Sequence, residues 1–421
     1  MGVATTYNPG SNAAPADSSA RGDPEPAGPF AMSRFTALLL FFASMVSPAF
    51  SADPPAGTTL PDDIDPATGL ARTTVVKPLG DAPPVPDLRA PRPTPIPGRP
   101  HVALILPTAS EALGRLAEAL RLGFVAAAEA GGKDAPPVTI TAIDNEAAGL
   151  LEACRDAQAR GALLVVAAIT RDGATALARS DCRRVPVLAL NEPQGVTDLP
   201  PDFFSVSLSL ENEARQAALL AVAEGWHSAI VITSVSPLAR RVQEAFEREW
   251  VRAAGELRAR ITFRGGPEDA PFVRERIAAL QGADMVFMAL DQPEARAVRP
   301  YVSGMLPLYA TSMSVNPRAE AIVNVDLQGV RYVEMPWFIQ PDHPAVMVYP
   351  VPRGAMSVEQ ERLYAFGIDA FRLALQLMRV DRRAPLDGVT GRITLEAGNT
   401  FARAMTPSEV DGGRVIPMRS P

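Results

Sequence analysis

The sequence predicts an α/β protein with two doubly wound, Rossmann-like lobes, joined by a hinge of several strands. From residue 101 onward, short apolar runs alternate with segments of helical periodicity. Continuous apolar strands between amphipathic helices are typical of parallel sheets that helices cover on both faces. The alternation starts once at residue 101 and again after residues 205–226. This restart predicts two similar lobes and not a tandem repeat of short period.

The first lobe begins with the run HVALILP, which stops at Pro107. The next segment has helical periodicity and ends at Gly131-Gly132, a typical helix stop. The same two patterns then recur along the chain. We expect strands at 101–107, 138–144, 163–170 and 185–191, with helices at 111–132, 146–162 and 172–179.

The second lobe repeats this order of strand and helix. Its first strand, SAIVITS, and its third, ADMVFMAL, are mostly apolar, as buried parallel strands are. We expect strands at 228–234, 257–263, 283–290 and 306–312, with helices at 238–254, 271–281 and 294–301.

The segment VRYVEMPW, residues 330–337, is a candidate crossover between the lobes. It follows the last strand of the second lobe and precedes a long helix, 358–380, which we assign to the first lobe. Pro336 would fix φ at the bend and remove a backbone donor. Trp337 would pack in the core near the hinge or line the cleft. Both residues are therefore hinge candidates, and 391–396 and 415–418 are predicted late strands.

These elements predict a discontinuous division of the folded region. Lobe 1 would comprise 101–207 plus 338–384, and lobe 2 would comprise 208–337 plus 385–418.

The region before residue 101 has no globular pattern. Residues 1–31 are polar and rich in Pro, Gly and Ser, which predicts a disordered extension before Met32, the expected true start. Residues 32–51 read as a cleavable signal peptide, with Arg34, a short apolar run and small residues before Ala52. Residues 52–100 form a Pro-rich stalk, either extended polyproline II or a plain disordered linker. We expect an exported, periplasmic protein without a lipid anchor, since no Cys stands at the cleavage point.

Composition excludes several functional classes. The net charge of −7 argues against nucleic-acid binding, which needs clustered positive charge. The three histidines, His101, His227 and His343, have no spacing typical of metal ligands. No nucleophile motif, P-loop or dinucleotide fingerprint follows a strand. We therefore expect no enzyme activity, no cofactor and no metal.

The predicted strand ends carry polar, uncharged side chains that are candidates for a cleft between the lobes. Ligands of doubly wound sheets bind outside the carboxyl ends of the strands. For each residue taken singly, capping of the next helix is the alternative that we favour. The candidates are Thr108, Ser110, Thr170, Asn191, Ser234, Ser236, Thr311 and Ser312, together with Asp291, the carboxylate that we place at a strand end in the second lobe.

Cys154 and Cys182 are the only cysteines, an even pair in a chain that we expect to be exported. Cys154 lies in the second predicted helix, and Cys182 lies just before the fourth strand. Adjacent βα units can bring such positions together, so we predict a disulfide; two buried thiols are the alternative.

Four motifs carry a resemblance to a known family. The lobe order over residues 101–418 is similar to that of type I periplasmic binding proteins, which are two-lobed clamshells. The motifs PLYATS, DLQGVRYVEMPW, RLYAFGIDAFRLA and GVTGRITLE more closely resemble the C-terminal domain of the penicillin-binding protein activators, the LppC-like family. Many members are outer-membrane lipoproteins with helical repeats at the N-terminus, whereas this chain has a Pro-rich stalk and no lipobox Cys.

The resemblance implies a non-enzymatic envelope regulator whose partner is a class A penicillin-binding protein, a peptidoglycan synthase. The alternative is a periplasmic solute-binding protein for a small polar ligand such as an amino acid. A zwitterionic ligand calls for charged groups in the cleft, and the strand ends offer only Asp291. The regulator is therefore the favoured hypothesis.

Overall fold

The structure is a computed structural model that describes residues 99–418 except 197, 267–268, 281, 303, 305, 353–355 and 380. All described residues belong to one compact unit, Pro78–Pro421. The predicted extension 1–31, the signal peptide 32–51 and the stalk up to residue 98 lie outside the described residues.

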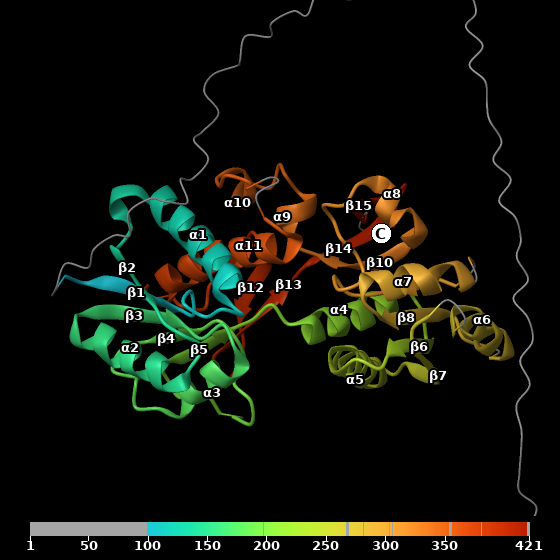
Figure 1. The fold of residues 1–421 in the computed structure, drawn as a ribbon, viewed down its shortest axis with the longest axis horizontal. Helices are drawn as coiled ribbons and strands as arrows, with labels where there is room; N and C mark the ends of the chain where they lie inside the picture. The colour runs from blue at the N-terminus through green and yellow to red at the C-terminus, as the bar shows by residue number, and fades with distance from the viewer. Residues whose placement is uncertain are drawn as a thin grey trace, which may run out of the picture. The chain divides into compact units, whose positions relative to one another are not determined.

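The described residues form two mostly parallel sheets with helices on both faces, which confirms the predicted fold class (Figure 1). The first sheet, with its helices, is called lobe 1. Its strand order is β11-β12-β13-β5-β4-β3-β1-β2. Its strands are β1 (His101–Leu106), β2 (Val138–Ala142), β3 (Ala162–Ala167), β4 (Val187–Ala189), β5 (Phe203–Val206), β11 (Leu386–Gly388), β12 (Gly391–Leu395) and β13 (Thr400–Ala404). Its helices are α1 (Gly114–Ala130), η1 (Gly132–Asp134), α2 (Ala147–Ala159), α3 (Arg171–Arg179), α9 (Pro336–Ile339), α10 (Pro344–Met347) and α11 (Val358–Leu377).

Two hydrophobic cores sandwich the sheet of lobe 1, because neighbouring residues of a strand point to opposite faces. Val102 and Leu104 of β1 pack in the core that α1 and α11 cover. Ala103 and Ile105 of the same strand pack in the core under α2 and α3. Full burial on both faces explains why this strand reads as a continuous apolar run.

Helices α1 and α11 approach closely because each offers a glycine to the other. A Cβ added at Gly123 would lie 1.8 Å from the carbonyl oxygen of Tyr364, and one at Gly367 would lie 2.1 Å from that of Leu120. The helix that the sequence places after the crossover is thereby fixed against the first helix of lobe 1.

A disulfide joins Cys154 of α2 to Cys182, which follows α3. The Cα atoms lie 6.2 Å apart, a separation that suits a disulfide, and both side chains are buried. The bond ties together the two helices that cover one face of the first sheet.

Lobe 2 contains the second sheet, whose strand order is β15-β14-β10-β9-β8-β6-β7. Its strands are β6 (Ser228–Ser234), β7 (Glu256–Phe263), β8 (Met285–Ala289), β9 (Leu308–Tyr309), β10 (Val330–Glu334), β14 (Thr406–Asp411) and β15 (Arg414–Pro417). Its helices are α4 (Leu210–Ala223), α5 (Pro237–Arg252), α6 (Asp269–Ala279), α7 (Gln292–Val298), η2 (Arg299–Tyr301), α8 (Ala321–Asn324) and η3 (Val325–Leu327). Helices α4 and α5 cover one face, and α6 and α7 cover the other.

The chain crosses between the lobes three times. It leaves lobe 1 between β5 and α4, returns at Met335 between β10 and α9, and leaves again at Met405 between β13 and β14. These three adjacent crossovers form the hinge.

The late strands divide differently from the sequence-based assignment, which placed 385–418 in lobe 2. Strands β11, β12 and β13 belong to the first sheet, where β13 pairs with β5. Asp369 of α11 fixes the β11–β12 turn, because its carboxylate accepts hydrogen bonds from the amides of Val389 and Thr390 and from the Thr390 hydroxyl. Only β14 and β15 join lobe 2.

Candidate functional site

The candidate site is a cavity of about 320 Å³ between the two lobes, beside the hinge. Its walls come from the β5–α4 crossover, α4, the segment after β9, Met335 and the start of α11. Apolar and polar side chains share the lining, which consists of Leu208, Leu210, Glu213, Gln292, Ser312, Met313, Val315, Asn316, Met335, Val358, Glu359 and Arg362. The cavity therefore suits a small molecule with both apolar and polar groups.

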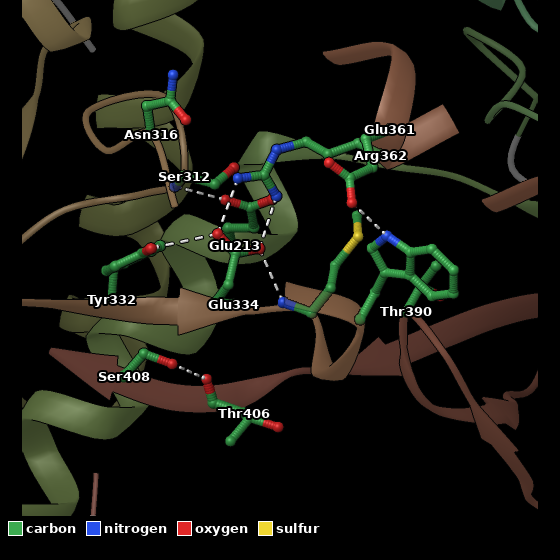
Figure 2. A network of polar contacts seen from close by, with 12 residues as sticks. Glu213, Ser312, Asn316, Tyr332, Glu334, Glu361, Arg362, Thr390, Thr406 and Ser408 are labelled. Carbon is green, nitrogen blue, oxygen red and sulfur yellow. Dashed lines mark hydrogen bonds and ion pairs between the residues drawn. The ribbon is translucent and has the colours of Figure 1, made fainter. Parts of the chain in front are cut away.

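A buried ion pair joins the lobes at this cavity. Glu334 ends β10 in lobe 2, and Arg362 lies on α11 in lobe 1. The two terminal guanidinium nitrogens of Arg362 donate to the Glu334 carboxylate, over 2.7 and 2.8 Å (Figure 2). Tyr332 and the amide of Met335 also donate to Glu334. Burial alone would lower the pKa of Arg362, but the charge and hydrogen bonds of Glu334 raise it above its usual value. This guanidinium is therefore always charged and already paired.

Glu213 of α4 is a second carboxylate at the cavity, and it is 3% exposed. One of its oxygens accepts a hydrogen bond from the amide of Ser312 over 2.8 Å (Figure 2). Burial raises the pKa of Glu213, and the charge of Arg362 and the Ser312 amide oppose that rise only in part. A cationic group in the cavity would favour the charged form of this carboxylate.

Trp337, one of the two hinge candidates, is a core residue with a polar role. Pro336 occupies the first turn of α9, and the Trp337 ring is buried in the core of lobe 1. The indole N–H donates to Glu361 of α11 over 2.9 Å. Arg318 of lobe 2 donates to the same carboxylate. Trp337 therefore orients an acidic side chain that reaches across the lobes.

The hinge has its own polar support behind the cavity. Arg403 of β13 is buried and donates to the carbonyl oxygens of Ser207 and Thr390. Gln216 of α4 donates to the carbonyl oxygen of Arg403 and accepts from the amide of Met405. Two of the three crossovers are thus tied together by side chains, which limits how freely each can bend.

A second charged cavity, of about 270 Å³, lies on the other side of α4. There Arg171 of lobe 1 and Arg241 of lobe 2 both donate to Glu211, over 2.6 and 3.0 Å. Burial would raise the pKa of Glu211, but these hydrogen bonds and its own backbone amide lower it to about 2. Glu211 therefore remains ionised and bridges the lobes.

The structure brings only Ser312 of the nine predicted cleft residues into the cavity between the lobes. Thr170 and Ser236 cap α3 and α5, the alternative that we favoured for each uncharged residue singly, and Asp291 caps α7. Thr170 also lines a separate cavity within lobe 1.

The remaining candidates serve turns or the core. Ser110 accepts a hydrogen bond from the amide of Leu113, and Asn191 bonds the backbone of Ile169 and Glu192. Ser234 and Thr311 are buried, and Thr108 lies in the turn after β1. Seven of the nine candidates thus line none of these three cavities: Thr108, Ser110, Asn191, Ser234, Ser236, Asp291 and Thr311.

Sequence reasoning missed the charged residues of the site. The strand ends were read as uncharged apart from Asp291, yet Glu213, Glu334 and Arg362 meet beside the hinge. Glu334 had a visible signal, since it stands inside the apolar run of β10, where an unpaired charge is costly. Glu213 and Arg362 lie in helices whose periodicity does not distinguish them from solvated charges.

Among the described residues, no helix is both long and apolar enough to cross a membrane. Within the same residues, no group of three or more His, Cys, Asp or Glu side chains is placed to hold a metal ion.

Comparison with protein families gives one match that covers most of the chain. The family described as "LppC putative lipoprotein" matches residues 98–413. Among curated proteins, the "Penicillin-binding protein activator LpoA" of Photobacterium profundum is 25% identical over 340 residues, and that of Pantoea ananatis is 26% identical over 320. The alignments cover 72% and 65% of this chain but 55% and 47% of those relatives. The chain thus spans about half the length of the curated relatives it matches.

Solved structures support the fold, and two of them carry titles that name different functions. The LpoA C-domain of Haemophilus influenzae, titled a regulator of PBP1A, has a TM-score of 0.64 and 21% identity, covering 76% of this chain and all of that one. A Chromobacterium violaceum protein, titled "Structure of a putative branched-chain amino acid ABC transporter", has a TM-score of 0.63 and 32% identity, covering 74% of this chain and 99% of that one.

Proposed function

The chain belongs to the LppC family, and from that premise we propose that it is a non-enzymatic envelope protein that activates a class A penicillin-binding protein by direct contact. The curated relatives are named as penicillin-binding protein activators, and the Haemophilus C-domain is titled a regulator of PBP1A. The shared region corresponds to that whole C-domain. We place the activating contact within it.

The observation that carries this proposal is the state of the charges between the lobes. Arg362 is committed to Glu334, Arg318 to Glu361, and Arg171 with Arg241 to Glu211. A zwitterionic ligand needs a cation for its carboxylate, and an unpaired buried charge is costly. Each of these four guanidinium groups would have to give up an existing partner to bind such a ligand. A protein contact makes no such demand.

We place the partner contact on the face of lobe 2 between Tyr309 and Trp337. Both of these aromatic residues are buried, so they cannot make the contact themselves. The segment α8–η3 between them exposes Ile322 and Val325, which are 70% and 46% exposed. Neighbouring exposed aliphatic side chains suit a protein interface whose core excludes water.

The test measures glycan-strand and cross-link synthesis by the cognate class A synthase, with and without the chain from residue 52 onward. We expect stimulation by the wild type, and a several-fold smaller stimulation by I322S/V325S with an unchanged unfolding midpoint. The matched control is L163S, because Leu163 is 44% exposed but lies in lobe 1. Failure of the wild type to stimulate any class A synthase would refute the proposal.

A second candidate function is the binding of a small amine or zwitterion. Glu213 favours it, since this buried carboxylate lines a cavity of suitable size, and the Chromobacterium protein is titled as a transporter. Calorimetry against a panel of amino acids decides between the two. Micromolar binding that E213Q abolishes, with no effect of the protein on the synthase, would favour the transporter function.

We place the protein in the periplasm, exported through the signal peptide at 32–51. N-terminal sequencing of the exported protein should give a start near Ala52, and a start at Met1 would contradict this.

A further inference from the structure

Two segments from different lobes face each other across the cavity beside the hinge. In lobe 2 the segment after β9 contributes Ser312, Met313, Val315 and Asn316 to the lining. In lobe 1 the first turns of α11 contribute Val358, Glu359 and Arg362. A contact between these segments has to break before the two lobes can move apart at the cavity.

Arg318 and Glu361 make that contact. The Arg318 Nε atom lies 3.1 and 3.0 Å from the two Glu361 carboxylate oxygens, and Nη2 lies 2.5 Å from one of them. The guanidinium group also lies over the Phe338 ring, 4.8 Å from its centroid. Glu361 is 6% exposed and Arg318 34%, so the pair is partly shielded from water. Such a pair is stronger than one in bulk solvent.

The segment that carries each side chain of the pair is fixed within its own lobe. On the lobe 2 side, Ser314 donates to the carbonyl oxygen of Leu290 over 2.6 Å, and Asn324 donates to that of Asn316 over 2.7 Å. On the lobe 1 side, Trp337 donates to Glu361, and the capping box of Ser357 and Gln360 fixes the start of α11. The pair therefore joins two rigid parts.

The pair differs from the other contacts between the lobes by its place in the chain. Glu334 directly precedes the crossover at Met335, so its pair with Arg362 belongs to the hinge itself. Arg318 lies between β9 and β10, away from all three crossovers in sequence. Its contact with Glu361 can break by rotation of one lobe, after which Glu361 keeps the hydrogen bond from Trp337 and gains solvent.

We infer that Arg318 and Glu361 form a latch that holds the two lobes closed over the cavity. In the closed state the pair is made, and in the open state both groups are solvated. The two states differ in this ion pair and in the apolar contacts around it, so a change in the pair shifts the equilibrium between them. The inference requires neither a partner nor a bound molecule, so it stands apart from the proposed function.

The test compares R318Q with R160Q in the chain from residue 52 onward. Arg160 pairs with Asp156 within α2, and both side chains are about half exposed, so R160Q removes an arginine without affecting the lobes. Spin labels on cysteines introduced at Lys133 in lobe 1 and Thr262 in lobe 2, both exposed, report the distance between the lobes. Amide exchange reports opening at residues 311–319 and 357–366.

We expect R318Q to lengthen and broaden the distance distribution and to accelerate exchange in both segments about tenfold, the effect of about 1.4 kcal/mol. R318K, which keeps the charge but not the planar fork, should fall between R318Q and the wild type. R160Q should match the wild type. A folded R318Q with an unchanged distance distribution and unchanged exchange would overturn the latch.

If R318Q does not fold, the salt dependence of the wild-type distance tests the latch instead. Molar salt weakens a partly exposed pair, so it should lengthen the distance between the labels. An unchanged distance in high salt, with R318K also identical to the wild type, would likewise overturn the inference.

Discussion

Glu213 and Glu211 lie two positions apart on the first turn of α4, and their environments shift their pKa values in opposite directions. Glu213 is buried beside a guanidinium group that another carboxylate already holds, and burial raises its pKa. Glu211 receives hydrogen bonds from two arginines, and its pKa falls to about 2 despite burial. Substitutions at these two glutamates therefore measure how buried charges between the lobes affect the free energy of unfolding.

We predict that E213Q is more stable than the wild type at pH 7 and equal to it near pH 4. A carboxyl with a raised pKa favours the folded state while it is protonated. That contribution is complete below the ordinary value of 4.5 and is lost as the pH rises through the raised value. Glutamine cannot ionise, and its side-chain oxygen can still accept the hydrogen bond that the Ser312 amide donates. Urea unfolding between pH 4 and pH 8 checks the prediction.

The control for this prediction is E211Q, which should behave in the opposite way. It should lose about 1 kcal/mol at pH 7, a figure that allows for the partial exposure of Glu211, and the loss should shrink toward pH 2. A less stable E213Q at pH 7 would mean that the attraction of Arg362 outweighs the cost of burial.

The polar residues at strand ends show why single positions were hard to predict from the sequence. Thr170, Ser236 and Asp291 all follow strands, and all three cap helices. A strand that leads into a helix needs a cap at the same position where a ligand would bind. Sequence alone therefore places such a residue but does not separate its two roles. Glu213 and Arg362 were missed because their burial depends on the other lobe.

At the scale of elements, the disulfide connects α2 to the segment after α3 and closes a loop of 28 residues. We predict that C154A/C182A loses about 3 kcal/mol of unfolding free energy, because the unfolded chain regains the freedom of that loop. Denaturant unfolding of the oxidised variant and the wild type measures the loss.

The reduced wild type provides the comparison for this prediction. Wild type unfolded with a strong reductant should approach the stability of the variant. Equal unfolding midpoints for the oxidised wild type and C154A/C182A would show that the disulfide does not stabilise the fold by restricting the unfolded chain.

Most individual helices and strands were predictable from the sequence, but which strands pair with one another was less predictable. The strands β1, β3, β6 and β8 and the long helix α11 stand where their apolar periodicity places them. The alternating run at 391–396 correctly predicts a strand, β12. Its sheet was misassigned, because its neighbour β13 reaches β5 by a pairing of Thr400 with Ser205, far back in the sequence. Periodicity reports burial, and it does not report which distant strand lies alongside.

At the scale of the whole molecule, the fold class and the family were both predictable from the sequence. The single restart of the strand–helix alternation indicated two lobes, and four motifs indicated the family. The interlocking of the lobes at the C-terminus was not predictable, since β11 to β13 and β14 to β15 are adjacent hairpin segments that separate into different sheets.

We predict that two truncations will affect different lobes. A chain that ends at Ala404 lacks β14 and β15, and β10 of lobe 2 loses its antiparallel neighbour. A chain that ends at Pro385 also lacks β11 to β13, so β5 of lobe 1 becomes an edge and Asp369 loses its partners at Val389 and Thr390. Amide exchange should rise in 330–334 for the first chain, and in both 330–334 and 203–206 for the second.

This prediction fails if the chain that ends at Pro385 shows faster amide exchange at 330–334 but unchanged amide exchange at 203–206. Lobe 1 would then hold its sheet without the late strands, and the discontinuous division would have no effect on its stability.

The three crossovers also determine when each lobe can form as the chain is made. Lobe 1 contains the first strand of the fold and also β13, which sits beside β5 in the middle of its sheet. A chain that emerges from its N-terminus cannot complete that sheet until residue 404 is available, when lobe 2 still lacks β14 and β15 alone. Neither lobe can therefore finish folding well before the other, and an incomplete chain exposes the edge of β5. Late completion of this kind delays the pairing of the β5 edge until almost the whole folded region has been made.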